Sequence, residues 1–411
     1  MKTTHTTNKQ TRSAKRKASA FFKMLTSLSL AALMLVGLCA CGAKEEWPVD
    51  KETGLTEFLI GGIGPTTGEH ANYGNSVKNG AQLAVNEINA AGGVNGFKFV
   101  LNFQDSQGSA ESAASAYGMQ MDLGMKVSLG GTLSGENASI AAASVADKMF
   151  LLTPSASSIN AITASDRAFR ICFSDPYQGT ASAQYIHQYG LATKVAVIYD
   201  SGLDYCQGLF ETFSAECKKL GIEILTVQTY TSSTNTDFSA QIAAVKASGA
   251  DLVFLPIYAA DAAKILTQAA QTAAFEGMIP FGCDGLDGLI GKMENNEKHA
   301  EGVMLLTPFA ADDPAENTQA FVSAYKANFN SVPDQFAADA YDAVYVVAAA
   351  LKAAEVTSED RDNVSERLAA AMTSLKYDGL TGSMTWEANG DTQKNAKAMV
   401  IKNGVAVLYQ P

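Results

Sequence analysis

Short apolar runs alternate with segments of helical spacing along most of the chain. Residues 58–63 form an apolar run that predicts a strand, and residues 77–88 then place their apolar side chains on one helical face. Strands that alternate with helices in this way predict right-handed βαβ units and parallel sheets. The further predicted strands are 97–103, 126–129, 149–153, 194–199, 222–227, 252–255 and 278–281, and the helices between them are 110–123, 137–148, 177–189, 205–220, 238–248 and 259–274.

The strands are too many for one comfortable sheet, and the alternation restarts after residues 170–176. We therefore expect an α/β fold with two Rossmann-like lobes, each a parallel sheet flanked by helices, joined by a multi-strand hinge. Beyond the second lobe we expect a return strand at 301–308 and helices at 318–329 and 339–354. Asn403-Gly404 between two apolar runs predicts a hairpin. The predicted lobes are 56–173 with 306–380, and 174–305 with 381–411.

The amino terminus has the pattern of an export signal. The first 23 residues carry seven basic side chains and no acidic one, and an apolar run follows at 24–40. This order is typical of a secretory signal peptide, whereas a membrane span would need a longer run. Leu38-Cys39-Ala40-Cys41 resembles a bacterial lipobox, with cleavage before Cys41 and lipid on its thiol. We expect a signal peptide at 1–40 and a lipidated tether at 41–55.

The composition and charge argue against one class of function, nucleic-acid binding. The chain has 411 residues, of which 47% are hydrophobic and 18% charged, as in globular proteins. Its formal net charge is −12 despite the basic start, so the body is acidic. An acidic body without a basic block disfavours nucleic-acid binding, which requires clustered Lys and Arg.

Cysteine and histidine usage indicates no metal site. Besides Cys39 and Cys41, four cysteines remain, and their wide spacing includes no C-x-x-C pair. The sequence does not choose among their possible pairings. They are Cys172, Cys206, Cys217 and Cys283. The four histidines are scattered, and no nucleophile motif is present, so we expect no metal, no cofactor and no enzyme activity.

Three loops that follow predicted strands are candidates for ligand binding, because parallel α/β sheets bind ligands beyond the carboxyl ends of their strands. The glycine-rich loop 61–68 lacks the third glycine of a dinucleotide motif. Loops 130–135 and 153–158 carry the hydroxyls of Ser134 and Ser157. Such serines often cap helices. Together, two hydroxyl-bearing loops with exposed N–H groups also suit a carboxylate.

An ordered set of short segments resembles the type I periplasmic binding proteins of ABC importers, closest to the leucine/isoleucine/valine-binding branch. No single segment is diagnostic, but the set extends over essentially all of the expected mature chain. It comprises Pro65, Tyr73-Gly74, residues 80–85, residues 87–94 with Gly96, Asp105-Ser106, residues 130–134, residues 153–157, Asp175 with Gln178-Gly179, Tyr199-Asp200, Tyr205, residues 380–384 and residues 389–391.

The resemblance implies roles for individual residues. Ser134 would grip a ligand carboxylate, Ser155 would offer a backbone carbonyl, and Ser157 would replace a family threonine. Asp284 would face the ligand ammonium, although it is one methylene shorter than the glutamate of leucine-binding members. Cys206 departs from the usual glycine after the aromatic at 205. The aromatic residues of the cleft would be Tyr73, Tyr205 and Tyr258.

The resemblance also implies a function. We expect an extracytoplasmic lipoprotein, a monomer on the outer face of the membrane, that captures an amino acid in the cleft between its lobes and delivers it to an ABC permease. A ligand of another kind, such as an amide, a urea-like molecule or an aromatic acid, is an alternative. A secreted enzyme on the same scaffold would require a catalytic motif. A sensory ectodomain would require a second membrane segment and an output domain.

Overall fold

The computed structural model describes residues 47–410. The predicted signal peptide, the lipidation site at Cys41 and the start of the predicted tether lie outside the described residues. The chain divides into two units, Met1–Pro48 and Val49–Pro411, and the fold described below is that of the second unit.

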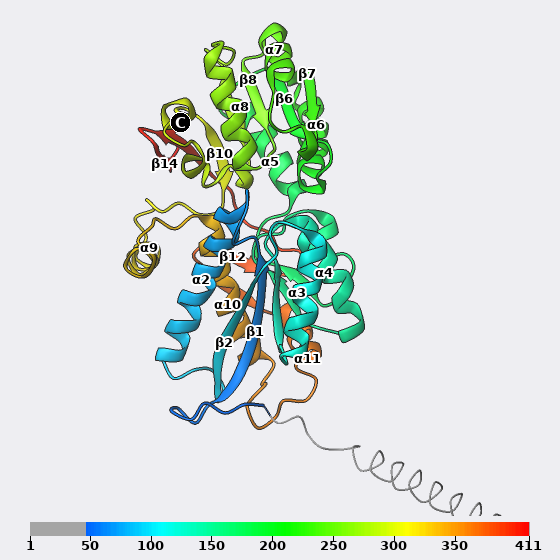
Figure 1. The fold of residues 1–411 in the computed structure, drawn as a ribbon, viewed down its shortest axis with the longest axis vertical. Helices are drawn as coiled ribbons and strands as arrows, with labels where there is room; N and C mark the ends of the chain where they lie inside the picture. The colour runs from blue at the N-terminus through cyan, green and yellow to red at the C-terminus, as the bar shows by residue number, and fades with distance from the viewer. Residues whose placement is uncertain (1–46, 411) are drawn as a thin grey trace, which may run out of the picture. The chain divides into compact units, whose positions relative to one another are not determined.

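The first sheet has five parallel strands in the order β2-β1-β3-β4-β5 (Figure 1). Helix α2 packs along α10 and helix α3 along α4, and we call this sheet with its helices the first lobe. The strands are β1 (Thr56–Gly64), β2 (Phe97–Asp105), β3 (Val127–Gly131), β4 (Leu151–Thr153) and β5 (Ala168–Arg170). The helices are α2 (Ala71–Ala90), α3 (Ala110–Asp122), α4 (Ser134–Asp147), α9 (Glu316–Phe329), α10 (Gln335–Ala353) and α11 (Val364–Met372).

The second sheet has seven strands in the order β14-β13-β10-β9-β8-β6-β7, and with its helices it forms the second lobe. Its pairs are parallel except for β10–β13 and β13–β14. The strands are β6 (Lys194–Asp200), β7 (Glu223–Tyr230), β8 (Leu252–Leu255), β9 (Ile279–Gly282), β10 (Met304–Thr307), β13 (Lys397–Lys402) and β14 (Val405–Leu408). The helices are α5 (Asp175–Gln188), α6 (Asp204–Leu220), α7 (Ser239–Ser248) and α8 (Ala259–Gln271). Two lobes of mainly parallel sheet flanked by helices confirm the predicted α/β fold.

The chain passes between the lobes three times. The first passage follows β5 and leads into α5, and the second follows β10 and leads to α9, which packs on α2. The third lies between a small two-stranded sheet, β11 (Lys376–Gly379) with β12 (Gly382–Thr385), and strand β13. Before this passage the indole Nε1–H of Trp386 donates to the Arg170 carbonyl at 2.8 Å, so the segment after β12 lies against the first sheet.

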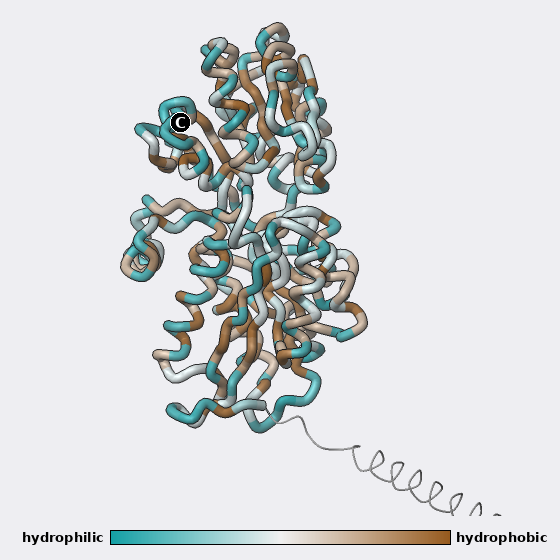
Figure 2. The backbone as a smooth tube through the Cα atoms, viewed as in Figure 1, coloured by the Kyte–Doolittle hydropathy of each residue, from teal (hydrophilic) through white to brown (hydrophobic). Residues whose placement is uncertain are grey.

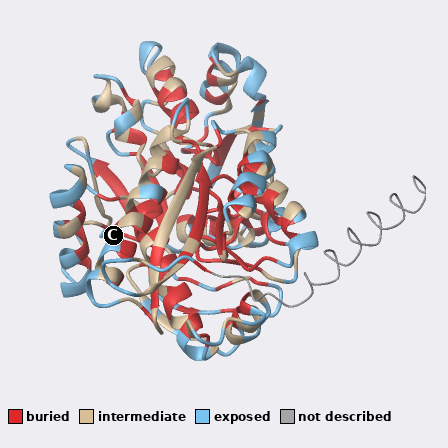
Figure 3. Ribbon diagram, turned by 60° about the horizontal axis from the view of Figure 1, so that its bottom comes forward, coloured by how far each residue is buried: buried red, intermediate tan, exposed pale blue. Residues whose placement is uncertain are grey.

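Apolar residues lie along the central strands of each lobe, and many residues of these strands are buried (Figures 2 and 3). In the first lobe the ring of Phe58 contacts those of Phe97 and Phe99, with centroids 5.2 and 5.6 Å apart. In the second lobe the rings of Phe213 and Phe254 stack at 3.9 Å. Over residues 47–410, no helix is both long and apolar enough to cross a membrane.

The differences from the predicted elements are of two kinds. Helix α11 and strands β11 and β12 were not predicted, and the ends of other elements are displaced. Helix α2 begins six residues before the predicted start at 77, because Asn75 Nδ2 bonds to the Thr66 carbonyl and Gly74 lies against the backbone of Pro65. Strand β5 was not predicted, since three residues are too few to show a period. The structure confirms the hairpin predicted at Asn403, where Lys402 pairs with Val405 across the turn.

Candidate ligand-binding site

Two serine-bearing loops of the first lobe meet at the carboxyl ends of neighbouring strands. β3 and β4 pair in parallel, so the loops that follow them share one edge of the sheet. The Ser158 N–H donates to Ser134 Oγ at 3.2 Å, and Ser155 Oγ donates to the Thr132 carbonyl at 2.7 Å. Ser134, Ser155 and Ser157 are all buried. The structure therefore brings the three predicted serines together in one polar cluster.

Helix capping does not account for Ser134. The capping residue of α4 is Leu133, and its N–H is accepted by Glu136 Oε2 at 3.0 Å, while Ser134 is the first helical residue. The Ser134 oxygen receives the Ser158 N–H, so its own proton remains available to donate to an anion. This arrangement is the one that carboxylate binding requires.

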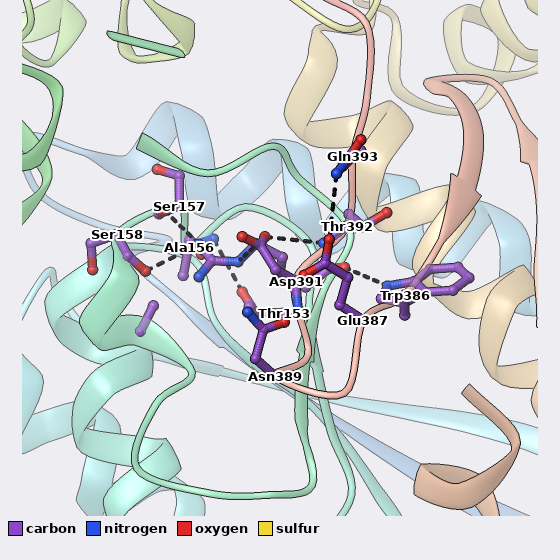
Figure 4. A network of polar contacts seen from close by, with 12 residues as sticks. Thr153, Ala156, Ser157, Ser158, Trp386, Glu387, Asn389, Asp391, Thr392 and Gln393 are labelled. Carbon is purple, nitrogen blue, oxygen red and sulfur yellow. Dashed lines mark hydrogen bonds and ion pairs between the residues drawn. The ribbon is translucent and has the colours of Figure 1, made fainter. Parts of the chain in front are cut away.

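Arg170 holds the loop that carries Ser155 and Ser157. This side chain is buried, and its Nη1 donates to the carbonyls of Ala156, Ser157 and Ser158. Its Nε lies 3.1 Å from Asp391 Oδ1. Figure 4 shows the serine loop and the loop from Trp386 to Gln393 facing each other across this network. Arg170 therefore holds loop 153–158, called the serine loop below, in place by charge-assisted hydrogen bonds.

In the second lobe, an aromatic residue holds the predicted acidic group. Tyr205 Oη donates to Asp284 Oδ1 at 2.7 Å and accepts the Gly285 N–H at 2.8 Å. The ring of Tyr258 stacks on that of Tyr205, with centroids 4.8 Å apart and planes 5° apart. The Asp284 N–H donates to Gln178 Oε1 at 3.1 Å. These contacts bring Tyr205, Tyr258 and Asp284 into one cluster and fix the direction of the carboxyl group.

Tyr73 joins the first lobe to this cluster. It lies on α2, and its hydroxyl donates to the Gly285 carbonyl at 2.6 Å and accepts the Ala259 N–H at 2.8 Å. Its ring lies 5.6 Å from that of Tyr258 and 4.7 Å from that of Phe336. All four aromatic residues therefore line one region where the lobes touch.

Burial controls the charge of the acidic groups. It raises the pKa of Asp284 to about 6, although the hydrogen bond from the Tyr205 hydroxyl and the nearby Gln178 side chain oppose the shift. It also raises the pKa of Asp175 well above its usual value, and the nearby Asp284 adds to that effect. A cation nearby, such as an ammonium group, would therefore stabilise the ionised form of both carboxyl groups.

Sequence reasoning did not single out three residues of this region. Phe336 lies near the start of α10, where an apolar residue looks like ordinary core. Arg170 does carry a signal, since it is the one charged residue in the apolar stretch 168–173. Gln178 was noted only as part of the family resemblance, and its contact with Asp284 depends on residues far apart in the chain.

The described residues contain no group of three or more His, Cys, Asp and Glu side chains arranged to hold a metal ion. The four cysteines between residues 47 and 410 are free and buried, so the structure contains none of the pairings that the sequence left open.

Comparison with known proteins assigns this chain to a protein family. The family model for periplasmic binding proteins matches residues 57–404. The chain belongs to this family. It is 30% identical over 348 residues to Leu/Ile/Val-binding protein homolog 3 of Brucella melitensis, an alignment that covers 82% of this chain and 88% of the relative. It is therefore a type I binding protein of the Leu/Ile/Val-binding group, whose members are solute-binding proteins and not enzymes.

Solved structures agree with this assignment. The substrate-binding protein LivJ of Streptococcus pneumoniae, in complex with isoleucine, is 28% identical with a TM-score of 0.78, covering 87% of this chain and 100% of LivJ. The leucine-binding protein LivK of Thermotoga maritima is 26% identical with a TM-score of 0.77, covering 86% of this chain and 98% of LivK. The similarity to both extends through the two lobes.

Proposed function

We propose that this chain is the extracytoplasmic substrate-binding lipoprotein of an ABC importer and that it captures a branched-chain or similar amino acid. The proposal rests on one observation: a site that suits an anion lies on one lobe, and a site that suits a cation lies on the other. Serine hydroxyls lie on the first lobe, and a buried carboxyl group, Asp284, is held by Tyr205 on the second lobe. A zwitterion needs an anion site and a cation site of this kind. The resemblance to Leu/Ile/Val-binding relatives supports the choice of an aliphatic side chain.

The same arrangement implies closure around the ligand. An amino acid held by Ser134 and Ser157 on one lobe and by Asp284 on the other bridges the two lobes. Tyr73 supports this view, because its hydroxyl already bonds to backbone groups of the second lobe. Closure by hinge motion is an established way for two-lobed binding proteins to enclose a ligand. Delivery to a permease would then begin from the closed form.

The ligand can be identified from the purified protein. We expect mass spectrometry to find a small amino acid in the protein as purified. A thermal-shift screen should show that leucine, isoleucine or valine raises the melting temperature, since a ligand bound only by the folded state stabilises it. Amides, urea-like compounds and aromatic acids form the second arm of the screen. If only members of that arm raise the melting temperature, the amino-acid assignment is wrong and the alternative replaces it.

The lipid anchor is a separate part of the proposal. It is supported by the lipobox at 38–41, after a basic and apolar leader. Replacing Cys41 with Ala removes the thiol that would carry the lipid, so the variant should leave the membrane fraction or keep its leader. Two acyl chains suffice for stable anchoring, which makes the expected change in fractionation large. A Cys41→Ala variant of wild-type processed size that still sediments with membranes would contradict the anchor; Cys39→Ala is the matched control.

A further inference from the structure

Asp175 is a buried acid whose carboxyl group makes no hydrogen bond of good geometry within residues 47–410. It is the first residue of α5 and is 0% exposed, and neither carboxylate oxygen is bonded to any other described residue. The Ser157 hydroxyl lies near enough to lower the pKa of the carboxyl group but not in hydrogen-bonding geometry, and the Asp175 N–H donates to the Ser157 carbonyl at 3.0 Å. Buried polar groups in native proteins are nearly always satisfied, so an exception of this kind requires an explanation.

Arg170, the cation that acts on Asp175, does not supply the missing partner. Arg170 lowers the pKa of Asp175, but its guanidinium bonds to three carbonyls of the serine loop and pairs with Asp391. The other charged neighbours, Asp284 and Asp204, are acidic and raise the pKa of Asp175. The titratable side chains that face Asp175 are Asp284, Asp204, Arg170, Tyr205, Tyr258, Cys206 and Cys283.

Two further polar groups beside Asp175 lack partners in the same part of the structure. Gln178 lies three residues further along α5, and its Nε2 is buried and unbonded while its Oε1 accepts the Asp284 N–H. The buried hydroxyl of Ser158 is also unbonded, although the N–H of the same residue reaches Ser134. Unsatisfied groups therefore adjoin the serine cluster, through Ser158, and Asp284, through Gln178.

We propose that Asp175 is a second carboxyl group of the ammonium site and that the ligand's ammonium lies between Asp175 and Asp284. The inference rests on the amino-acid function proposed above. A primary ammonium has three N–H donors, and Asp284, the Ser155 carbonyl and Asp175 can each accept one. In the empty protein two neighbouring buried carboxyl groups cannot both ionise, so they retain a proton. The ammonium takes over the role of that proton, and binding releases it to solvent.

This arrangement makes Asp175 a residue that determines specificity. It favours a primary amine over an N-methylated one, because each methyl group removes a donor that one of the three acceptors needs. It also lowers the stability of the ligand-free protein, because a buried carboxyl group there has no ligand ammonium to interact with. Neutralising Asp175 should therefore leave the ligand-free protein as stable as the wild type, or more stable, while it weakens ligand binding.

The test compares Asp175→Asn and Asp175→Ala with the wild type by calorimetry, using leucine and its deaminated analogue 4-methylpentanoate. The matched control is Asp204→Asn, which changes an exposed acid at the start of α6 that also interacts with Asp175. Titrations in phosphate and imidazole buffers at pH 6.5, which differ in their heats of ionisation, measure proton release. We expect both Asp175 variants to bind leucine about tenfold or more weakly, to bind 4-methylpentanoate almost unchanged, and to release fewer protons.

Three outcomes are distinguishable. Wild-type affinity for leucine in both Asp175 variants would overturn the inference and would mean that water alone satisfies Asp175. Equal losses for leucine and 4-methylpentanoate would also overturn it, since the residue would then act on the site as a whole. If the wild type binds no amino acid, the proposed function itself fails. Melting temperatures of the ligand-free variants show whether they are folded, and a value well below wild type in both would contradict the predicted stability.

Discussion

Replacing Asp284 with Asn should weaken binding of the amino-acid ligand by about ten- to a hundredfold. A charge-assisted hydrogen bond to the ammonium is worth roughly 1.5–3 kcal/mol, and every ~1.4 kcal/mol corresponds to a factor of ten in affinity. Asparagine keeps the shape and the oxygen that accepts the Tyr205 hydroxyl, so the loss isolates the charge. Calorimetry at pH 7.5 provides the measurement. Ser134→Ala should cost less, because backbone N–H groups would still hold the carboxylate.

The deaminated analogue distinguishes a direct contact from a general disturbance. Loss of the ammonium should weaken binding far more in the wild type than in Asp284→Asn, which is the signature of coupling between the two groups. Equal losses in both proteins would show that Asp284 does not contact the ammonium.

The same residue makes affinity depend on pH. Because burial raises the pKa of Asp284 to about 6, the carboxyl group is ionised at neutral pH and becomes protonated as the pH falls through that value. The protonated form cannot pair with an ammonium, so affinity should decline as the pH falls, most steeply below about pH 6, where Asp284 as well as Asp175 is protonated in the empty protein. The slope approaches tenfold per unit for each proton released on binding. Asp284→Asn should have a flatter profile. The values measured in the wild type belong jointly to Asp284 and Asp175, since the two groups interact.

Replacing Arg170 with Met should lower the free energy of unfolding by roughly 3–5 kcal/mol, because breaking a buried charged network leaves its partners unpaired. The variant removes the Arg170 donor from three carbonyls of the serine loop and leaves Asp391 without its ion pair. The Ser157 and Ser158 carbonyls keep backbone N–H donors from Asp175 and Ala161, whereas the Ala156 carbonyl loses its donor. Chemical denaturation provides the measurement. Ligand affinity should fall as well, since the loop carries Ser155 and Ser157.

Arg167 offers the matched control. It lies three residues earlier in the chain, and its partner Asp166 has a side chain that is 86% exposed. Exposed pairs contribute about 0–1 kcal/mol, so Arg167→Met should have a small effect. Similar losses for the two variants would mean that the buried network around Arg170 contributes nothing beyond an ordinary surface charge.

The fold was largely predictable because short-range patterns in the sequence determine most of its strands and helices. Strand and helix periods follow from short-range patterns, and the turn at Asn403 and Gly404 follows from residues that accept positive φ, with observed values of 52° and 74°. Element ends were less predictable. The start of α10 depends on Asp334, whose side chain accepts the Ala337 N–H, and on the lobe around it. Short strands such as β5 depend on their neighbours for pairing.

The candidate site was only partly predictable, because its contacts join distant residues. The sequence supplied the loops, and the family resemblance supplied roles for Ser134, Tyr205 and Asp284. The bond between Tyr205 and Asp284 connects positions 79 residues apart, and no local pattern announces it. Likewise, nothing in the sequence indicates that Asp175 lacks a partner, since this depends on the packing around it.

The most direct test is a crystal structure of the full-length chain with the amino acid that it retains on purification. The account predicts one ligand between the lobes, with its ammonium nitrogen at about 2.7–3.2 Å from an Asp284 oxygen and its carboxylate at the Ser134 hydroxyl. A ligand bound outside this region, or one that places a carboxylate rather than an ammonium against Asp284, would contradict the account.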